Sequence, residues 1–93
     1  MNKSVKIKKR INHDSMWISC LFPSGGNFRY TITRYSKKLE LAFSNDSGEC
    51  KIQAKILQDW LEAQDMSYGD LFNKLEGLCA SCNTGQELIT KIS

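Results

Sequence analysis

The chain has 93 residues, of which 41% are hydrophobic and 25% charged, and its formal net charge at pH 7 is +3. This length suits one domain, which we expect to span residues 1–93, and it leaves little core for a deep catalytic cleft. No apolar run approaches the ~20 residues that cross a bilayer, and the basic N-terminus lacks the apolar stretch of a secretory signal. We therefore expect a cytoplasmic protein with no membrane partner.

Positive charge is concentrated in the first half of the chain. Residues 1–43 contain nine Lys and Arg against two acidic residues, a net charge of +7. Residues 44–93 contain four Lys against eight acidic residues, a net charge of −4. This asymmetry divides the domain into a basic half (1–44) and an acidic half (45–93), and it indicates an anionic partner for the basic half.

The basic half has the period of β-structure. Apolar and polar residues alternate through residues 16–22, 28–33 and 38–43, and the Pro23-Ser24-Gly25-Gly26-Asn27 cluster predicts a turn between the first two runs. Residues 5–11 alternate as well. They predict either a fourth strand at the sheet edge or a disordered basic arm that contacts phosphates.

The acidic half has the period of helices. Three helix starts are predicted, each from a capping residue with an acidic residue three positions later: Asp46, Ser67 and Thr84. Gly77 is expected to end the second helix early. The first helix is expected to point Gln53 to solvent and to bury an apolar stripe formed by Ile52, Ile56, Leu57, Trp60 and Leu61. The fold class predicted is α+β, with a three- or four-stranded antiparallel meander packed against three C-terminal helices.

Catalysis is not expected. His13 is the only histidine, and it lies beside Asp14 in a polar segment, where a solvated surface residue is the usual outcome. Gly25-Gly26 joins two strands rather than a strand and a helix, so it lacks the context of a phosphate-binding loop. We therefore predict a protein that is not an enzyme.

The four cysteines allow two interpretations. Cys79 and Cys82 have the CxxC spacing of a zinc site, which Cys20 and Cys50 could complete. They also fit the apolar stripe of a helix, where thiols pack as small hydrophobic groups. We expect core packing and no cofactor, with structural zinc as the alternative.

Residues 56–93 resemble a helix-turn-helix of the lambda-repressor/Cro type. The run Leu57-Gln58-Asp59-Trp60-Leu61-Glu62-Ala63-Gln64-Asp65-Met66-Ser67-Tyr68-Gly69-Asp70-Leu71-Phe72-Asn73-Lys74-Leu75 carries the resemblance, with Ser67 as the helix cap and Leu71 and Leu75 as packing leucines. The resemblance implies that residues 84–93 form a recognition helix, from which Gln86, Thr90 and Lys91 would reach base edges. It also implies DNA binding, and a homodimer is common in that family.

The sheet face opposite the helices is the second candidate surface. Alternation places cations and an aromatic residue on it, which suits a phosphate backbone and stacked bases. The nucleic-acid-binding residues predicted from the basic half are Lys6, Lys8, Lys9, Arg10, Trp17, Arg29, Arg34, Tyr35 and Lys38. Exposed strands of any protein can carry such residues, so an ordinary solvated face is the competing interpretation.

Two functions follow from these observations. The leading prediction is a small DNA-binding regulatory protein, with DNA favoured over RNA, that uses the basic sheet face, the helix-turn-helix, or both. The alternative is a protein-binding inhibitor or adaptor of the kind that phages and mobile elements encode against host nucleic-acid machinery. In that alternative, the basic face docks on an acidic protein surface.

Overall fold

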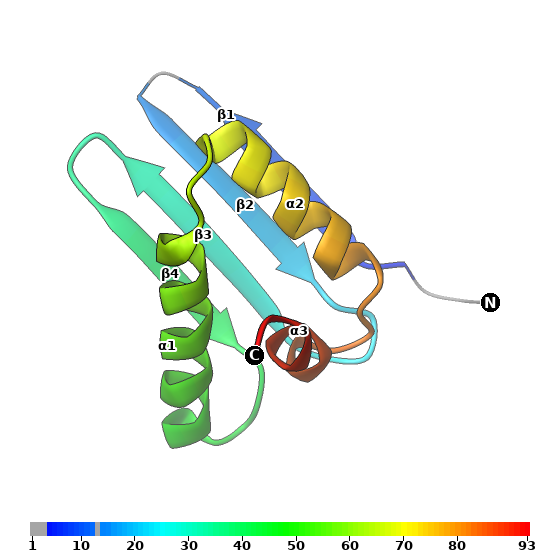
Figure 1. Ribbon diagram of the computed structural model, residues 1–93. Helices are drawn as coiled ribbons and strands as arrows, with labels where there is room; N and C mark the ends of the chain where they lie inside the picture. The colour runs from blue at the N-terminus through cyan, green and yellow to red at the C-terminus, as the bar shows by residue number, and fades with distance from the viewer. Residues whose placement is uncertain (1–3, 13) are drawn as a thin grey trace.

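The computed structural model describes residues 4–12 and 14–93, so the prediction for His13 falls outside the described residues. Four strands precede three helices in the chain (Figure 1). This arrangement confirms the α+β class. The elements are β1 (Lys6–Ile11), β2 (Ser15–Leu21), β3 (Asn27–Thr33), β4 (Lys37–Ala42), α1 (Ser47–Ala63), α2 (Tyr68–Ala80) and α3 (Gly85–Ile92).

The strands form one antiparallel meander in the order β1-β2-β3-β4. Residues 6–11 pair with β2 along their whole length, from Lys6 opposite Leu21 to Ile11 opposite Met16. The fourth-strand prediction is therefore correct, and the disordered-arm alternative is wrong. Residues 6–11 form a strand because the apolar positions of β1, among them Ile7, fall on the same sheet face as those of β2. They pack against the core there.

All three helices cover one face of the sheet, with α1 along β4, α2 along β1, and α3 packed against both helices (Figure 1). The smallest dimension of the molecule is 19 Å, about the thickness of one sheet and one layer of helices. Within residues 4–12 and 14–93, no helix is both long and apolar enough to span a bilayer. The opposite face of the sheet has no covering element in the described part of the chain, and we call it the open face.

The core lies between the sheet and the helices. Phe22, Phe28 and Phe43 form an aromatic cluster with ring centroids 5.8–6.2 Å apart, and Tyr30 meets Phe72 of α2 edge to face at 6.4 Å. Burial raises the pKa of Tyr30 above its ordinary value, which is the effect expected of an apolar site on a phenol. The alternating residues of the strands thus supply one side of the core, as predicted.

The three predicted helix starts are confirmed at the level of individual hydrogen bonds. Asp46 accepts from the backbone N–H of Gly48 and Glu49, at 2.8 and 3.3 Å. Ser67 and Thr84 each accept from the N–H three residues later, both at 3.2 Å. These side chains satisfy backbone donors that have no partner within the helix.

Two details of the helices differ from the predictions. Ile52 is 65% exposed, whereas Gln53 is only 4% exposed and donates to Glu49. The buried face of α1 runs through Gln53, Leu57 and Leu61, because four-residue spacing aligns these positions. Gly77 does not end α2, which continues to Ala80. Gly77 is exposed, so the helix loses no packing there.

The β2–β3 turn holds α3 in place. Gly25 and Gly26 have φ values of +133° and +99°, which side chains rarely allow. The N–H of Ser24 donates to the carbonyl of Asn83 at 2.9 Å, and the N–H of Gly85 donates to the carbonyl of Gly25 at 3.2 Å. The glycine pair therefore allows a tight turn, and this turn hydrogen-bonds directly to the start of α3.

Candidate nucleic-acid interface

Strand register determines which side chains share the open face, because directly paired residues point to the same side of a sheet. Three rows cross all four strands and a fourth crosses the two central ones. The rows are Lys6-Leu21-Asn27-Ala42, Lys8-Ser19-Arg29-Glu40, Arg10-Trp17-Thr31-Lys38 and Ser15-Thr33. The alternation in the sequence predicted these faces correctly.

The open face has a strong positive bias. It carries five cations (Lys6, Lys8, Arg10, Arg29 and Lys38) and one acid, Glu40. Lys38 and Glu40 approach to 3.9 Å, with side chains 71% and 60% exposed, and such a solvated pair contributes little. The other four cations form no ion pair with any carboxylate of residues 4–12 and 14–93. Their charge is therefore available to a partner.

An aromatic residue lies among these cations. The guanidinium carbon of Arg29 is 4.8 Å from the ring centroid of Trp17, within the range of a cation–π contact. The two residues are diagonal neighbours on β2 and β3, because Trp17 pairs with Thr31 and Arg29 pairs with Ser19. Arg29 is exposed and Trp17 is half-buried. The indole thus supports a guanidinium whose hydrogen-bond donors remain free to bind a ligand.

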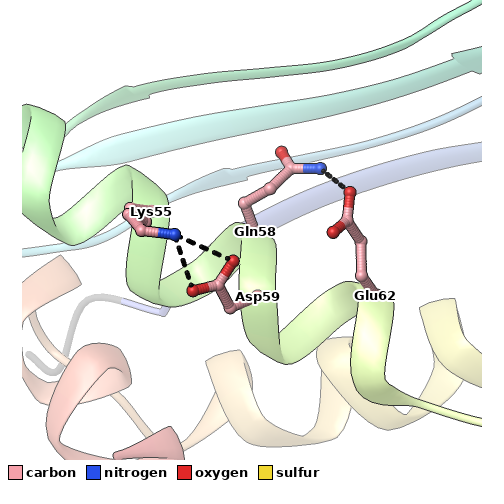
Figure 2. Close-up of polar contacts among 4 residues, drawn as sticks. All are labelled: Lys55, Gln58, Asp59 and Glu62. Atoms are coloured by element: carbon pink, nitrogen blue, oxygen red, sulfur yellow. Dashed lines mark hydrogen bonds and ion pairs between the residues drawn. The ribbon is translucent and has the colours of Figure 1, made fainter.

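The helical layer has the opposite charge. Its outer surface is polar, as Figure 2 shows for α1, where Lys55 contacts both carboxylate oxygens of Asp59 at 3.1 and 3.5 Å. Gln58 donates to Glu62 at 2.8 Å on the same helix. Since residues 44–93 carry a net charge of −4, the two sides of the molecule differ in sign. A polyanion is attracted to the sheet side and repelled by the helix side.

Three predicted binding residues of the basic half lie away from the open face. Lys9 points toward the helices, where its ammonium donates to Asn73 at 2.6 Å and lies 3.4 Å from Glu76. Arg34 and Tyr35 belong to the β3–β4 turn, and Arg34 pairs with Asp14 at 3.2 Å. These residues do not join the cluster that Lys6, Lys8, Arg10, Trp17, Arg29 and Lys38 form.

The predicted base-reading residues of α3 are engaged within the chain. Gln86 donates to Glu49 at 2.9 Å, the Thr90 hydroxyl donates to the carbonyl of Gln86 at 3.0 Å, and the Lys91 ammonium donates to Ser81. These residues lie in the helical layer, on the other side of the sheet from the open face. A partner bound on the open face would therefore not reach them. The likeness to a helix-turn-helix remains a prediction.

The four cysteines do not converge. Cys20 and Cys79 are neighbours in the core, and their hydrogen bond together with burial raises the pKa of the Cys79 thiol. Burial also raises the pKa of Cys82. Cys50 lies apart and donates to the carbonyl of Ser44 at 3.3 Å. Among the described residues, no three cysteine, histidine or acidic side chains form a group that could hold a metal ion. Structural zinc stays an untested alternative.

Sequence reasoning missed a hollow beside the open face. It has a volume of about 690 Å³ and is lined by Ser4, Lys6, Leu21 and the β2–β3 turn. Leu21 is 49% exposed there. Alternation did place Leu21 on the face opposite the buried positions of β2. An apolar residue on this basic face was the sequence feature that could have indicated the hollow.

Comparison of the chain with protein-family models, with curated proteins and with solved structures found no match. The charge and geometry of the open face are therefore the observations that bear on function.

Proposed function

We propose that this chain is a small, non-enzymatic DNA-binding regulatory protein of the cytoplasm that holds its ligand on the open face of the sheet. The single observation that carries this proposal is the group of four cations, Lys6, Lys8, Arg10 and Arg29, which have no acidic partner in the described part of the chain. Unpaired Lys and Arg side chains on one surface release counterions from a nucleic acid on binding, which is the main source of affinity for a phosphate backbone.

The open face is favoured over α3 as the binding surface. The open face has five cations and one acid, whereas α3 carries Glu87 near its start and Lys91 near its end. The side chains on α3 that would read bases must first break the hydrogen bonds of Gln86 and Lys91. The helix-turn-helix reading therefore ranks second within the same proposed function.

Fluorescence anisotropy with labelled DNA tests the proposal through salt dependence. If all five cations contact phosphates, the slope of log K against log[salt] is about −4.5 for duplex and about −3.5 for a single strand. Lys8→Ala should reduce the magnitude of the slope by roughly 0.7–0.9. Lys55→Ala is the matched control, because Lys55 is paired with Asp59 on the outer side of α1 and should leave the slope unchanged (Figure 2). Flat titrations at low salt would refute DNA binding.

A protein-binding inhibitor or adaptor remains the second candidate, and one observation favours it. Residues 44–93 carry a net charge of −4, so the helical layer would repel nucleic acid, and Ile52 is 65% exposed on that layer. A stoichiometric complex with a nucleic-acid-handling protein, in the absence of any DNA binding, would support this function over the first. Loss of that complex on Ile52→Ser would place the contact on α1.

A further inference from the structure

The width of the open face limits the nucleic acid that it can bind. Four strands spaced about 4.8 Å apart place the backbones of β1 and β4 about 14 Å from each other, before side chains are added. The major groove of B-DNA is about 12 Å wide and admits a helix or a two-stranded ribbon. A four-stranded face is therefore too wide to enter the groove, whereas an extended single strand can lie on it.

The cations of β1 are spaced for a phosphate backbone. Lys6, Lys8 and Arg10 are two residues apart and share the open face, so the Cα atoms of successive cationic residues are about 6.8 Å apart along the edge of the sheet. This separation is close to that of consecutive phosphates on an extended nucleic-acid strand. No acidic residue of the described chain pairs with these three side chains, so they form a continuous track of positive charge along β1.

The Trp17–Arg29 stack lies at the right distance from this track to meet a base. Trp17 is on the strand next to β1, and Arg29 is one strand further, about 10 Å from β1. Ser19, a small residue, lies between Lys8 and Arg29 in their row. A base that projects inward from a phosphate on β1 would pass over this gap and reach the guanidinium. The guanidinium carbon lies over the indole, 4.8 Å from the ring centroid, and the free face of the guanidinium can stack on the base.

We propose that the open face binds single-stranded nucleic acid, with consecutive phosphates on Lys6, Lys8 and Arg10 and one unpaired base stacked on Arg29, which Trp17 supports from below. This inference rests on the proposed nucleic-acid-binding function and narrows it to a ligand class. The stacking makes the contact tolerant of sequence, because every base presents a π face. The phosphate track sets the direction of the nucleic-acid strand, which runs parallel to β1 with its bases projecting across the sheet.

Competition between matched oligonucleotides tests the ligand class. An unstructured single strand and the duplex of the same sequence are titrated against the full chain at ~50 mM salt, with the single strand expected to bind at least about tenfold more tightly. Equal or tighter binding of the duplex would overturn this inference while leaving the proposed DNA-binding function intact. Failure of both ligands to bind would remove the function as well.

Arg29 substitutions test the stacking contact separately from charge. Arg29→Ala should weaken single-strand binding by about 5- to 150-fold, the range measured for loss of one stacked base. Arg29→Lys keeps the charge but lacks the planar group, so it should not restore affinity. Arg34→Ala is the matched control, because Arg34 is an exposed arginine of the β3–β4 turn that pairs with Asp14. Full recovery in Arg29→Lys would show a simple phosphate contact and overturn the stack.

Tryptophan emission gives a direct readout of the same contact. The chain has two tryptophans, Trp17 on the open face and Trp60 on α1, where Lys74 lies 5.5 Å from the ring centroid. In a Trp60→Phe variant, saturating single-stranded DNA should quench or shift the emission of Trp17. In a Trp17→Phe variant, the emission of Trp60 should stay unchanged. Unchanged Trp17 emission at saturation would place the strand elsewhere.

Discussion

The close approach of α3 to the aromatic cluster makes Gly85 the most sensitive glycine of the chain. A Cβ atom added at Gly85 would lie 2.7 Å from Cε1 of Phe43 and closer still to Cγ and Cδ1. Phe43 cannot move aside easily, because its ring is packed edge-on against Phe22 and Phe28, at 5.8 and 6.2 Å between centroids. Gly85→Ala must therefore displace either the ring or the first turn of α3.

The magnitude follows from the overlap. Carbon atoms prefer a separation of about 3.5–4.0 Å, so the new methyl group intrudes by about 1 Å. Overpacking of this kind costs about 1–3 kcal/mol, and the midpoint of that range corresponds to a loss of roughly 8–16 °C in Tm for a domain of this size. Gly77→Ala is the matched control, since no heavy atom lies within 4 Å of its added Cβ. Because Gly77 is an exposed position inside α2, this substitution should stabilise the protein by about 0.8–1.0 kcal/mol.

Thermal and urea unfolding followed by circular dichroism measures both variants under the same conditions. The expected result is a change of opposite sign: Gly85→Ala melts well below the parent chain, and Gly77→Ala melts above it. A Gly85→Ala protein as stable as the parent would refute the close packing of α3 on Phe43. A double variant, Gly85→Ala with Phe43→Leu, should recover part of the loss if the ring is the obstacle.

The remaining predictions concern the helix cap, the thiols and metal. Asp46→Ala removes a side chain that accepts two backbone N–H groups of α1, so unfolding should become easier by about 1 kcal/mol, with no change expected if the cap is irrelevant. The raised pKa of Cys79 keeps its thiol protonated in the fold, whereas the unfolded thiol ionises near its ordinary value of 9.0. The stability linked to Cys79 is therefore fully present below pH 9 and falls above it by up to about 1.4 kcal/mol per pH unit. Urea titrations of Cys79→Ala should show a smaller fall, because Cys82 and Tyr30, whose pKa values are also raised, remain. Under native conditions, mass spectrometry should find a thiol reagent on half-exposed Cys50 before the three buried cysteines, and early labelling of Cys79 would contradict the core described above. A chelator should leave Tm unchanged, and a fall in Tm would support the zinc alternative.

Local patterns in the sequence were enough to predict much of the fold. Hydrophobic period and capping residues act over a few positions, so alternation along β2 predicted that Trp17 and Leu21 lie opposite the buried Ile18 and Cys20. The helix starts at Asp46, Ser67 and Thr84 follow from the same short-range chemistry, and the structure bears them out. The charge asymmetry between the halves was visible in the sequence as well, because it needs only the order of the residues.

Contacts between distant segments determined the composition of the candidate site, and no local pattern contains them. Alternation along β1 puts Lys8 and Lys9 on opposite faces, but only the packing of α2 brings Asn73 and Glu76 within reach of Lys9. The Trp17–Arg29 stack depends on the register between β2 and β3, which is set by the turn between them. The sequence by itself thus determined the alternating pattern and the charge of each half. The tertiary packing decided which cations are left unpaired. Only the pairing of strands and the packing of helices on the sheet bring a carboxylate close to one lysine and leave its neighbour without one.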